Sequence, residues 1–395
     1  MPKVSVGPAR RAAFEILRRV ESDDAYASAL LAALPEDKLS REDRGLTQEL
    51  VLGVLRWQRT LDYFIERYSG RAPSGMDTAV RIALRIGLYQ LRYLSRIPSH
   101  AAVNESVNLV KSGGAKSAAG LVNAVLRKAA RQLDDQAGDG IDDPGERAAI
   151  ELSHPRWMIE RWRSSLGESQ AHALALANNQ PQPVAFRVIT LRAGEAQALD
   201  FLKAADVNVR RSAIVPGGYV VEGGAGPAIA DAVRRGMIYL QDQASQLVSL
   251  LLEARAGDRV LDLCAAPGSK TSHIADLIGN GAWIVAGDIH PHRIAILAAI
   301  CKSLGVECVY PLVLDAATVD LPFSAAFDRV LVDAPCTGTG TLRENPEIKW
   351  RLAPDDVARL AKIQVRLLEN ASRVVAEGGR LVYSTCSIER EEGED

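Results

Sequence analysis

Residues 259–279 read RVLDLCAAPGSKTSHIADLIG, and this stretch decides the fold of the C-terminal part of the chain. A short apolar strand, a turn of small residues around Gly268 and an amphipathic helix follow one another directly, which is typical of a doubly wound sheet. Gly268 and its small neighbours let backbone N–H groups approach a ligand before the helix begins. The turn is neither a GxGxxG fingerprint nor a GK[ST] phosphate loop, so it does not identify the ligand by itself.

Apolar strand segments alternate with amphipathic helical segments beyond this stretch. Further strands are predicted at 283–288, 307–315, 327–334 and 379–386, and helices at 270–279, 292–305 and 355–376. The alternation predicts a mostly parallel sheet covered by helices on both faces, a Rossmann-like α/β fold. Such a sheet binds its ligands at the carboxyl ends of its strands.

Three acids stand at successive predicted strand ends: Asp288, Asp315 and Asp333. A single Asp in such a place is more often the N-cap of the next helix. Three of them facing one crevice favour a binding edge instead. An acid about 20 residues beyond the first loop is also where this class of fold holds a ribose through its hydroxyls.

All five cysteines lie in the last third of the chain: Cys264, Cys301, Cys308, Cys336 and Cys386. Their odd number and the lack of a CxxC pair argue against disulfides and against a zinc site. The first three are interpreted as small buried hydrophobic residues. The last two lie in the polar turns Pro-Cys-Thr-Gly and Thr-Cys-Ser, which predicts two thiols at the binding edge of the sheet.

The first third of the chain is predicted to be helical throughout, because apolar residues recur three and four positions apart from 9 to 128. Residues 1–131 hold 21 Lys and Arg against 13 Asp and Glu, although the whole chain carries a net charge of -2. A polyanion partner would explain this excess, and so would a helical surface that simply carries arginine. The candidates for phosphate contacts cluster on the first helix and are Arg10, Arg11, Arg18 and Arg19.

A length of 395 residues, at roughly 150 residues per domain, predicts two or three domains. The stretch DDQAGDGIDDPGE is rich in acid, Gly and Pro, and it predicts a linker. The expected division is an all-helical domain at 1–133, an acidic linker at 134–150, a small α/β region at 151–236 with strands around a helix at 194–204, and the α/β domain at 237–395.

The segments CAAPGSKT, DAPCTGTGTLRENPEIKW and YSTCS, in this order, resemble the RNA cytosine-5 methyltransferases that use S-adenosylmethionine. In the N-terminal half, AFEILRRV, ELVLGVLRWQRTLDYFI and GLVNAVLRK resemble the NusB-like RNA-binding domain of the RsmB (Sun, or Fmu) family, which methylates a cytosine of 16S ribosomal RNA. The resemblance covers nearly the whole chain. It implies a Rossmann-like methyltransferase domain preceded by an all-α NusB-like domain and a small α/β region that binds RNA or connects the two.

The resemblance also implies roles for the residues at the binding edge. Cys386 is expected to be the nucleophile that adds to carbon 6 of cytosine, and Cys336 to assist release of the proton from carbon 5. Asp333 is expected to hydrogen-bond the amino group and N3 of the base.

S-adenosylmethionine is expected to lie across the first three strand ends, with the loop 264–270 at its methionine end. Asp288 would bind the ribose and Asp315 would lie near the adenine amino group, while Arg293 would help with the cofactor or with packing. The expected cofactor-binding residues are Cys264, Ala265, Ala266, Pro267, Gly268, Ser269, Lys270, Asp288, Arg293, Asp315 and Asp333.

The chain departs from the family pattern in three places. The RVN common in the middle region reads Arg187-Val188-Ile189, so no role is assigned to Ile189. Ser269 replaces the second Gly of the usual CAAPGGKT, which restricts the backbone angles of the loop. The sequence ends nine residues after Cys386, where the family continues through a helix and an antiparallel strand pair. Either the natural product continues, or the sheet lacks its last two strands.

Other features limit the function classes. No apolar run reaches the ~18 residues needed to cross a bilayer and no signal-peptide core is present, so we expect a soluble cytoplasmic monomer. His290 and His292 flank a proline without a partner acid or cysteine, so no metal site is expected. Two alternatives stay open: an RNA cytosine-5 methyltransferase with another substrate such as transfer RNA, and a non-catalytic RNA-binding scaffold. A scaffold would have no use for two thiols and three acids at one sheet edge.

Overall fold

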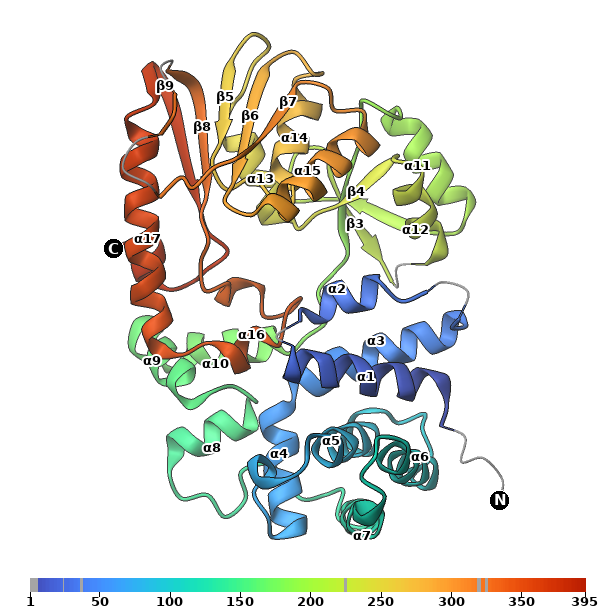
Figure 1. The fold of residues 1–395 in the computed structure, drawn as a ribbon. Helices are drawn as coiled ribbons and strands as arrows, with labels where there is room; N and C mark the ends of the chain where they lie inside the picture. The colour runs from blue at the N-terminus through green and yellow to red at the C-terminus, as the bar shows by residue number, and fades with distance from the viewer. Residues whose placement is uncertain (1–5, 24, 36–37, 224–225, 318–320, 324–325) are drawn as a thin grey trace. The chain divides into compact units, whose positions relative to one another are not determined.

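The computed structural model describes residues 6–23, 25–35, 38–223, 226–317, 321–323 and 326–395. The chain divides into two compact units, drawn in Figure 1. The helical unit comprises Met1–Pro181 and Thr339–Pro354, and the sheet unit comprises Gln182–Gly338 and Asp355–Asp395. A short piece of the C-terminal half therefore belongs to the helical unit.

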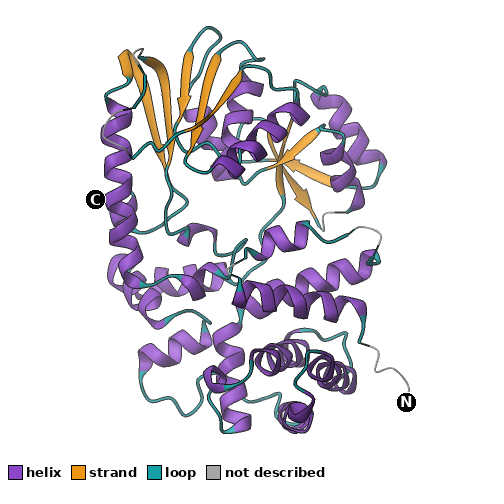
Figure 2. Ribbon diagram, in the orientation of Figure 1, coloured by secondary structure: helices purple, strands orange, loops and turns teal. Residues whose placement is uncertain are grey.

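The helical unit contains no strand among its described residues, and Figure 2 shows its elements as purple helices. Its helices are α1 (Pro8–Ser22), α2 (Ala27–Ala32), α3 (Arg41–Arg56), α4 (Gln58–Ser69), α5 (Thr78–Tyr93), α6 (Ser99–Ser112), α7 (Ala119–Ala129), α8 (Pro144–Glu151), α9 (Arg156–Leu166), α10 (Glu168–Asn178) and α16 (Ile348–Arg351), with short 3-10 turns at η1 (Pro73–Gly75), η2 (Lys116–Ala118) and η3 (Thr339–Thr341). The prediction of an all-helical first third is confirmed by α1 to α7.

Local sequence explains where these helices begin and which faces they bury. The Ser40 side chain accepts a hydrogen bond from the Asp43 N–H at the start of α3, and Asp77 caps α5 through the N–H of Ala79. Helix α5 is buried along most of its length, and its Leu84 belongs to the main apolar core of the unit. This core contains the apolar stripes expected from the spacing of three and four residues.

The predicted linker at 134–150 is only partly correct. Residues 134–143 form turns and irregular segments, but α8 begins at Pro144 within the expected range. The Asp143 side chain accepts a hydrogen bond from the Glu146 N–H (2.8 Å), and proline occupies the first helical position. An acid followed by proline therefore marks a helix N-terminus here rather than a continuing linker.

The sheet unit begins with a small antiparallel sheet in the order β2-β3-β1-β4. Its strands are β1 (Ala185–Val188), β2 (Asn208–Arg211), β3 (Gly218–Glu222) and β4 (Ile238–Leu240), and its helices are α11 (Glu195–Ala204) and α12 (Pro227–Arg234). The predicted strands around a helix at 194–204 are present. The boundaries differ from 151–236, because α9 and α10 belong to the helical unit while β4, which is too short to show a sequence pattern, lies beyond residue 236.

A five-stranded parallel sheet follows in the order β7-β6-β5-β8-β9. Its strands are β5 (Arg259–Asp262), β6 (Trp283–Asp288), β7 (Val309–Val313), β8 (Phe327–Asp333) and β9 (Val375–Ser384), with α13 (Gln243–Leu251), α14 (Ser269–Leu277), α15 (Pro291–Leu304), α17 (Pro354–Ser372) and the 3-10 turn η4 (Arg390–Glu392). The predicted doubly wound sheet is confirmed. The helix expected at 355–376 ends at Ser372, and β9 takes up the following apolar residues.

Neighbouring residues of one strand point to opposite faces of this sheet, and each face has its own apolar core. Val260 packs in a cluster with Ile274 of α14 and Leu297 of α15. The next residue, Leu261, packs in a second cluster with Leu367 of α17. Burial on both faces explains the almost continuous apolar strands in the sequence.

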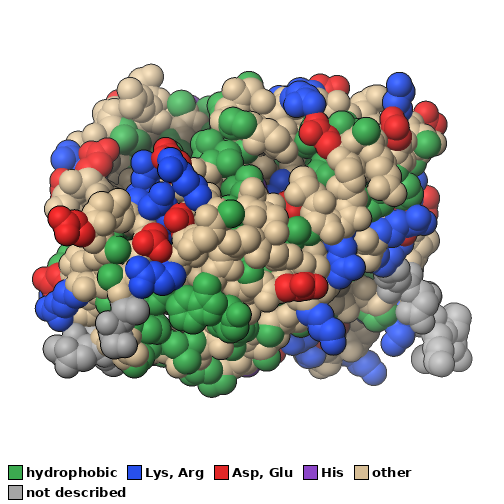
Figure 3. Space-filling model, turned by 90° about the horizontal axis from the view of Figure 1, so that it is seen from above, with side chains coloured by type: hydrophobic (Ala, Val, Ile, Leu, Met, Phe, Trp, Pro, Cys, Tyr) green, Lys and Arg blue, Asp and Glu red, His purple; other side chains and the backbone are tan. Residues whose placement is uncertain are grey.

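Two features describe the chain as a whole. No helix in the described ranges is both long and apolar enough to cross a membrane. On the face shown in Figure 3, Lys and Arg side chains lie next to Asp and Glu side chains, as the small net charge leads one to expect.

Candidate active site

The carboxyl ends of four neighbouring strands form one edge of the parallel sheet. Asp262 at the end of β5 is in register with Ala286 of β6 and with Leu331 of β8. Asp333, the last residue of β8, is in register with Ser384, the last residue of β9. The topology therefore brings together the strand ends that the sequence analysis singled out.

The two thiols meet at this edge. Cys336 follows β8, Cys386 follows β9, and their Sγ atoms lie 3.1 Å apart. The hydrogen bond between the thiols raises the pKa of Cys336, which burial raises further, while the same bond lowers the pKa of Cys386. Cys386 is therefore the thiol that ionises first, with Cys336 as the donor to its sulfur.

An ion pair lies beside the thiols. The Lys270 Nζ atom is 2.7 Å from Asp333 Oδ2, and the Ser384 hydroxyl donates to Asp333 Oδ1 (2.8 Å). Asp333 raises the pKa of Cys386 and Lys270 lowers it, so the pair acts on the Cys386 thiol in opposite directions. The sequence analysis named both residues, and the structure brings them together.

The loop before α14 has the backbone of a close-approach turn. Gly268 has a φ of +107°, and a Cβ atom at this position would lie 3.0 Å from Leu297 Cγ. Only glycine suits this position without strain. Ser269 is the first residue of α14 and is not among the described residues with positive φ, so replacing the family's glycine here imposes no left-handed serine.

Two buried carboxylates lie on the same side of the sheet as this loop. Asp262 is fully buried, its Oδ2 accepts from the Thr271 hydroxyl (2.7 Å), and its Oδ1 has no hydrogen-bond partner among the described residues. Burial raises the pKa of Asp262 to about 7. An unpaired buried oxygen beside a glycine cradle fits a ligand that carries hydrogen-bond donors.

Asp288, at the end of β6, is also buried. Its Oδ1 accepts from the His290 N–H (2.9 Å), and its Oδ2 lies 3.1 Å from Arg293 Nη1. Arg293 also donates to the Ala266 carbonyl (2.5 Å) and thus ties the loop to this strand end. Asp288, Arg293 and Ala266, three of the residues expected to hold S-adenosylmethionine, therefore form one connected group at the ends of β5 and β6.

The remaining predicted residues make fewer contacts with this group or lie in the apolar core. Asp315 follows β7, is exposed, and accepts a hydrogen bond from the Ala317 N–H (3.0 Å). Cys264 is half-buried, and burial raises its pKa to about 12. Cys301 and Cys308 lie in the apolar core, as predicted.

His290 and His292 are exposed, with ring centroids 5.6 Å apart. Within the described ranges no group of three or more His, Cys, Asp or Glu side chains could hold a metal ion.

Several residues at this edge were not predicted. Asp262 stands in the quoted stretch at the end of the first strand, so its position was a usable signal. Thr337, Gln364 and Glu392 form a buried hydrogen-bond network behind the thiols. Gln364 lies in the middle of α17, where nothing in the sequence pattern indicates its role.

The four arginines predicted to contact RNA lie on α1 of the helical unit. Arg10 donates to Gln90 Oε1 (2.7 Å), while Arg18 and Arg19 pair with acids on or just beyond their own helix. Arg11 is exposed. Exposed pairs of this kind are weak, so the exposed cations remain able to contact phosphates.

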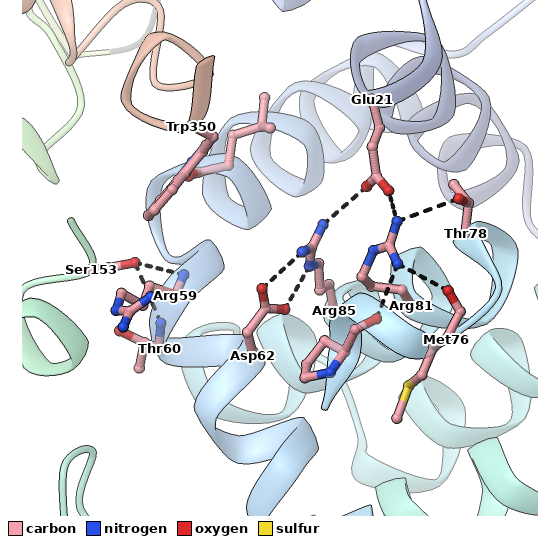
Figure 4. Close-up of polar contacts among 12 residues, drawn as sticks. Glu21, Arg59, Thr60, Asp62, Met76, Thr78, Arg81, Arg85, Ser153 and Trp350 are labelled. Carbon is pink, nitrogen blue, oxygen red and sulfur yellow. Dashed lines mark hydrogen bonds and ion pairs between the residues drawn. The ribbon is translucent and has the colours of Figure 1, made fainter. Parts of the chain in front are cut away.

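A hollow of about 790 Å³ lies elsewhere in the helical unit, between α1, α4, α5 and the piece that contains Trp350. Figure 4 shows its polar groups. Arg85 donates to both oxygens of Asp62 (2.7 and 2.8 Å) and pairs with Glu21, to which Arg81 is also paired. Because the carboxylates neutralise these two arginines, the hollow is not built as a phosphate site.

A parallel sheet with a glycine cradle after its first strand, an acid after its second and a thiol pair at its far end is the arrangement of a Rossmann-like methyltransferase. Known families agree with this class over most of the chain. Residues 249–395 match the family described as 16S rRNA methyltransferase RsmB/F, residues 7–131 match the NusB family, and residues 154–226 match the ferredoxin-like domain of RsmF/B-like methyltransferases. The chain belongs to the RsmB/F family, as the sequence motifs predicted.

Relatives and solved structures are similar over nearly the full length. The chain is 35% identical over 397 residues to the "Probable ribosomal RNA small subunit methyltransferase B" of Bacillus subtilis, which covers 100% of this chain and 88% of that protein. It is 35% identical over 380 residues to the ribosomal RNA small subunit methyltransferase B of Pseudomonas syringae (96% and 83% covered). The crystal structure of PH0851 superposes with a TM-score of 0.83 at 29% identity, over 99% of this chain and 88% of that one.

Proposed function

We propose that this chain methylates carbon 5 of a specific cytosine in 16S ribosomal RNA through a covalent adduct between Cys386 and the base. Membership of the RsmB/F family makes the chain an RNA methyltransferase. The observation that carries the finer proposal is the 3.1 Å separation of the Cys336 and Cys386 Sγ atoms at the ends of two adjacent strands. A transferase that methylates a nitrogen atom, which is already nucleophilic, would have no need of two thiols in contact.

The first step uses the thiol with the lowered pKa. Carbon 5 of cytosine is too electron-poor to attack a methyl group unaided. The Cys386 thiolate forms a bond to carbon 6, and the electron pair of the carbon 5–carbon 6 double bond becomes available at carbon 5, which then bonds to the methyl group. S-adenosylmethionine, when bound, would supply this methyl group on a positively charged sulfur, and that sulfur would keep the electron pair of the methyl–sulfur bond as the bond breaks.

The second step needs a base for the proton on carbon 5. Before the reaction, the neighbouring Cys386 sulfur keeps Cys336 protonated. Once the Cys386 sulfur is bonded to carbon 6 it no longer carries a negative charge, so Cys336 can give its own proton to solvent water and, as a thiolate, accept the proton from carbon 5. The electrons of the carbon–hydrogen bond then restore the double bond and expel the Cys386 thiolate.

Asp333 and Lys270 place a carboxylate and an ammonium group beside the proposed position of the base. Asp333 would accept hydrogen bonds from the cytosine amino group and from N3 once that atom is protonated in the adduct. Its ion pair with Lys270 (2.7 Å) and its bond from Ser384 fix the carboxylate in place. Lys270 in turn lowers the pKa of Cys386 and so favours the attacking thiolate.

The cofactor side of the proposal can be tested at Asp288. Replacing Asp288 by alanine should weaken S-adenosylmethionine binding by ~1.5–3 kcal/mol, roughly 10- to 150-fold in Kd, because this removes charge-assisted hydrogen bonds to the ribose hydroxyls. Calorimetry measures the change, and RNA affinity should stay the same. Unaltered cofactor affinity would leave Asp288 with only its local role of accepting from the His290 N–H. Asp231→Ala, which removes a carboxylate that pairs with Arg235 at the end of α12, is the matched control.

The RNA side can be tested by salt dependence. Replacing Arg11 and Arg18 by glutamine should weaken RNA binding, and the slope of log K against log salt should fall by ~0.7–0.9 for each phosphate that is no longer neutralised. Substitution is preferable to deletion of residues 1–131, because the piece 339–354 packs within the same unit. Arg359→Gln, on an exposed turn of α17, serves as the control. An unchanged slope would mean that these arginines face solvent and do not contact RNA phosphates.

The proposal as a whole is tested by mapping 5-methylcytosine in ribosomal and transfer RNA from a deletion strain, and by methylating isolated 16S ribosomal RNA with the purified protein. One cytosine in 16S ribosomal RNA should lack its 5-methyl group in the deletion strain and regain it when the RNA is treated with the purified protein. Loss of 5-methylcytosine from transfer RNA would mean that transfer RNA is the substrate. If the strain loses no 5-methylcytosine at all, the proposal is wrong.

A further inference from the structure

A buried carboxylate lies behind the thiols, on the last turn of the described chain. Glu392 is 1% exposed, and both of its oxygens face Thr337, the residue that follows Cys336. The Thr337 backbone N–H donates to Glu392 Oε1 (2.9 Å), and the Thr337 hydroxyl donates to Oε2. One side chain thus binds both donors of a single residue beside the proposed base.

Gln364 of α17 completes the support on the other side of Cys336. Its Nε2 donates to the Pro335 carbonyl (2.9 Å) and to Glu392 Oε1 (3.0 Å). The Tyr383 hydroxyl lies 2.8 Å from the Glu392 carbonyl oxygen and 3.1 Å from Gln364 Oε1. The residues before and after Cys336 are therefore both held by this buried group.

The same hydrogen-bonded group also contacts the turn that carries Cys386, the proposed nucleophile. Thr337 Oγ1 lies 3.0 Å from the hydroxyl oxygen of Ser387, the residue that follows Cys386. Because the Thr337 hydroxyl gives its only hydrogen to Glu392, Ser387 is the donor in this second bond. A chain of hydrogen bonds from Glu392 through Thr337 to Ser387 thus links the turns that carry the two thiols.

We propose that Glu392 is a positioning residue that sets the distance between Cys336 and Cys386, and so the efficiency with which Cys336 takes the carbon 5 proton from the adduct. This inference rests on the proposed function, because it assigns Glu392 to the release step of that reaction. Glu392 acts on the thiols through Thr337, whose two donors it binds.

The geometry requires acceptors at residue 392. Two acceptor oxygens match the two donors of Thr337, and one of them also accepts from Gln364. A glutamine keeps these contacts when its amide donates to the Thr337 hydroxyl oxygen and that hydroxyl donates to Ser387 instead. Methionine has a similar length but removes both oxygens, so in Glu392→Met the Thr337 N–H loses its acceptor, and the turn after β8 is free to move by the few tenths of an ångström that proton transfer does not tolerate.

The test separates release from attack. Wild-type protein, Glu392→Met and the exposed control Glu394→Met are incubated with S-adenosylmethionine and 16S ribosomal RNA at a pH high enough to ionise Cys386 in every variant, and both 5-methylcytosine and RNA-linked protein on a denaturing gel are measured over time. We expect turnover in Glu392→Met to fall about tenfold or more, the equivalent of ~1.4 kcal/mol in the barrier, while adduct formation in the first turnover changes little at this pH and RNA-linked protein accumulates. Thr337→Val should behave in the same way, and Thr337→Ser, which keeps the hydroxyl, should restore turnover.

Two other outcomes would overturn the positioning role: normal turnover without an adduct in Glu392→Met, or a parallel loss of attack and release at a pH where Cys386 is ionised. The thermal unfolding midpoint of each variant shows whether a parallel loss comes from misfolding. In that case the two Thr337 variants decide whether the positioning role holds, because valine keeps the shape of threonine and serine keeps its hydroxyl. If the wild-type protein forms no 5-methylcytosine, the proposed function itself has failed, independently of Glu392.

Discussion

Cys386→Ala should abolish methyl transfer and covalent capture of RNA, a loss of at least about 10⁴-fold, as is found when the nucleophile of a covalent enzyme is removed. The expected loss is this large because every later step needs the sulfur–carbon 6 bond. Binding of S-adenosylmethionine and of RNA should survive, since the main residues proposed to bind the cofactor, Asp288 and the loop 264–270, follow β5 and β6. Incorporation of a labelled methyl group and a denaturing gel measure both effects.

Cys336→Ala should give the opposite gel result, with RNA-linked protein accumulating because the adduct forms but is not released. The substitution also removes the hydrogen-bond donor that lowers the pKa of Cys386. The pKa of Cys386 should therefore rise, and adduct formation in this variant should need a higher pH than in the wild-type protein. Cys301→Ala, in the apolar core, is the control that should turn over normally. Normal turnover of Cys336→Ala without a slow band would contradict the roles assigned to the two cysteines.

The sequence predicted the site at the level of strand ends. Asp288, Asp333, Cys336 and Cys386 each follow an apolar strand, and parallel strands expose their carboxyl ends at one edge, so their proximity could be expected. The contact between the two thiols depends on β8 and β9 being neighbours, with Asp333 in register with Ser384. Register between strands separated by a long helix is set by packing and not by local pattern.

Residues whose partners are distant in sequence escaped prediction. Glu392 and Gln364 look like ordinary polar residues of a turn and a helix, and only the folded chain shows that both are buried against residues 335–337. The division of the chain was missed for the same reason. The piece 339–354 continues the motif that contains Cys336, yet it packs within the helical unit, where Leu342 joins the apolar cluster of α8, α9 and α10.

Lys349 anchors this piece in the helical unit. The side chain is fully buried, and its Nζ atom donates to the Arg56 carbonyl (2.9 Å), the Ser153 carbonyl (2.9 Å) and Asn179 Oδ1 (3.0 Å). An ammonium has three donors and here meets three acceptors, so each hydrogen is used. Burial, followed by the nearby Arg56 charge, lowers the pKa of Lys349 well below its ordinary value. The charge is thus costly, and the three bonds offset that cost.

Lys349→Met should destabilise the helical unit by about 3 kcal/mol, because the apolar side chain fills the space but leaves three buried oxygens without donors, each costing ~1–3 kcal/mol, while the burial cost of the ammonium is recovered. Urea unfolding followed by tryptophan fluorescence measures the change, since Trp350 is the next residue and donates from Nε1 to the Leu55 carbonyl (2.7 Å). Lys362→Met, on the exposed face of α17, should shift stability by less than ~0.5 kcal/mol. An unchanged midpoint for Lys349→Met would show that water replaces the ammonium and that the piece 339–354 is held by its apolar contacts alone.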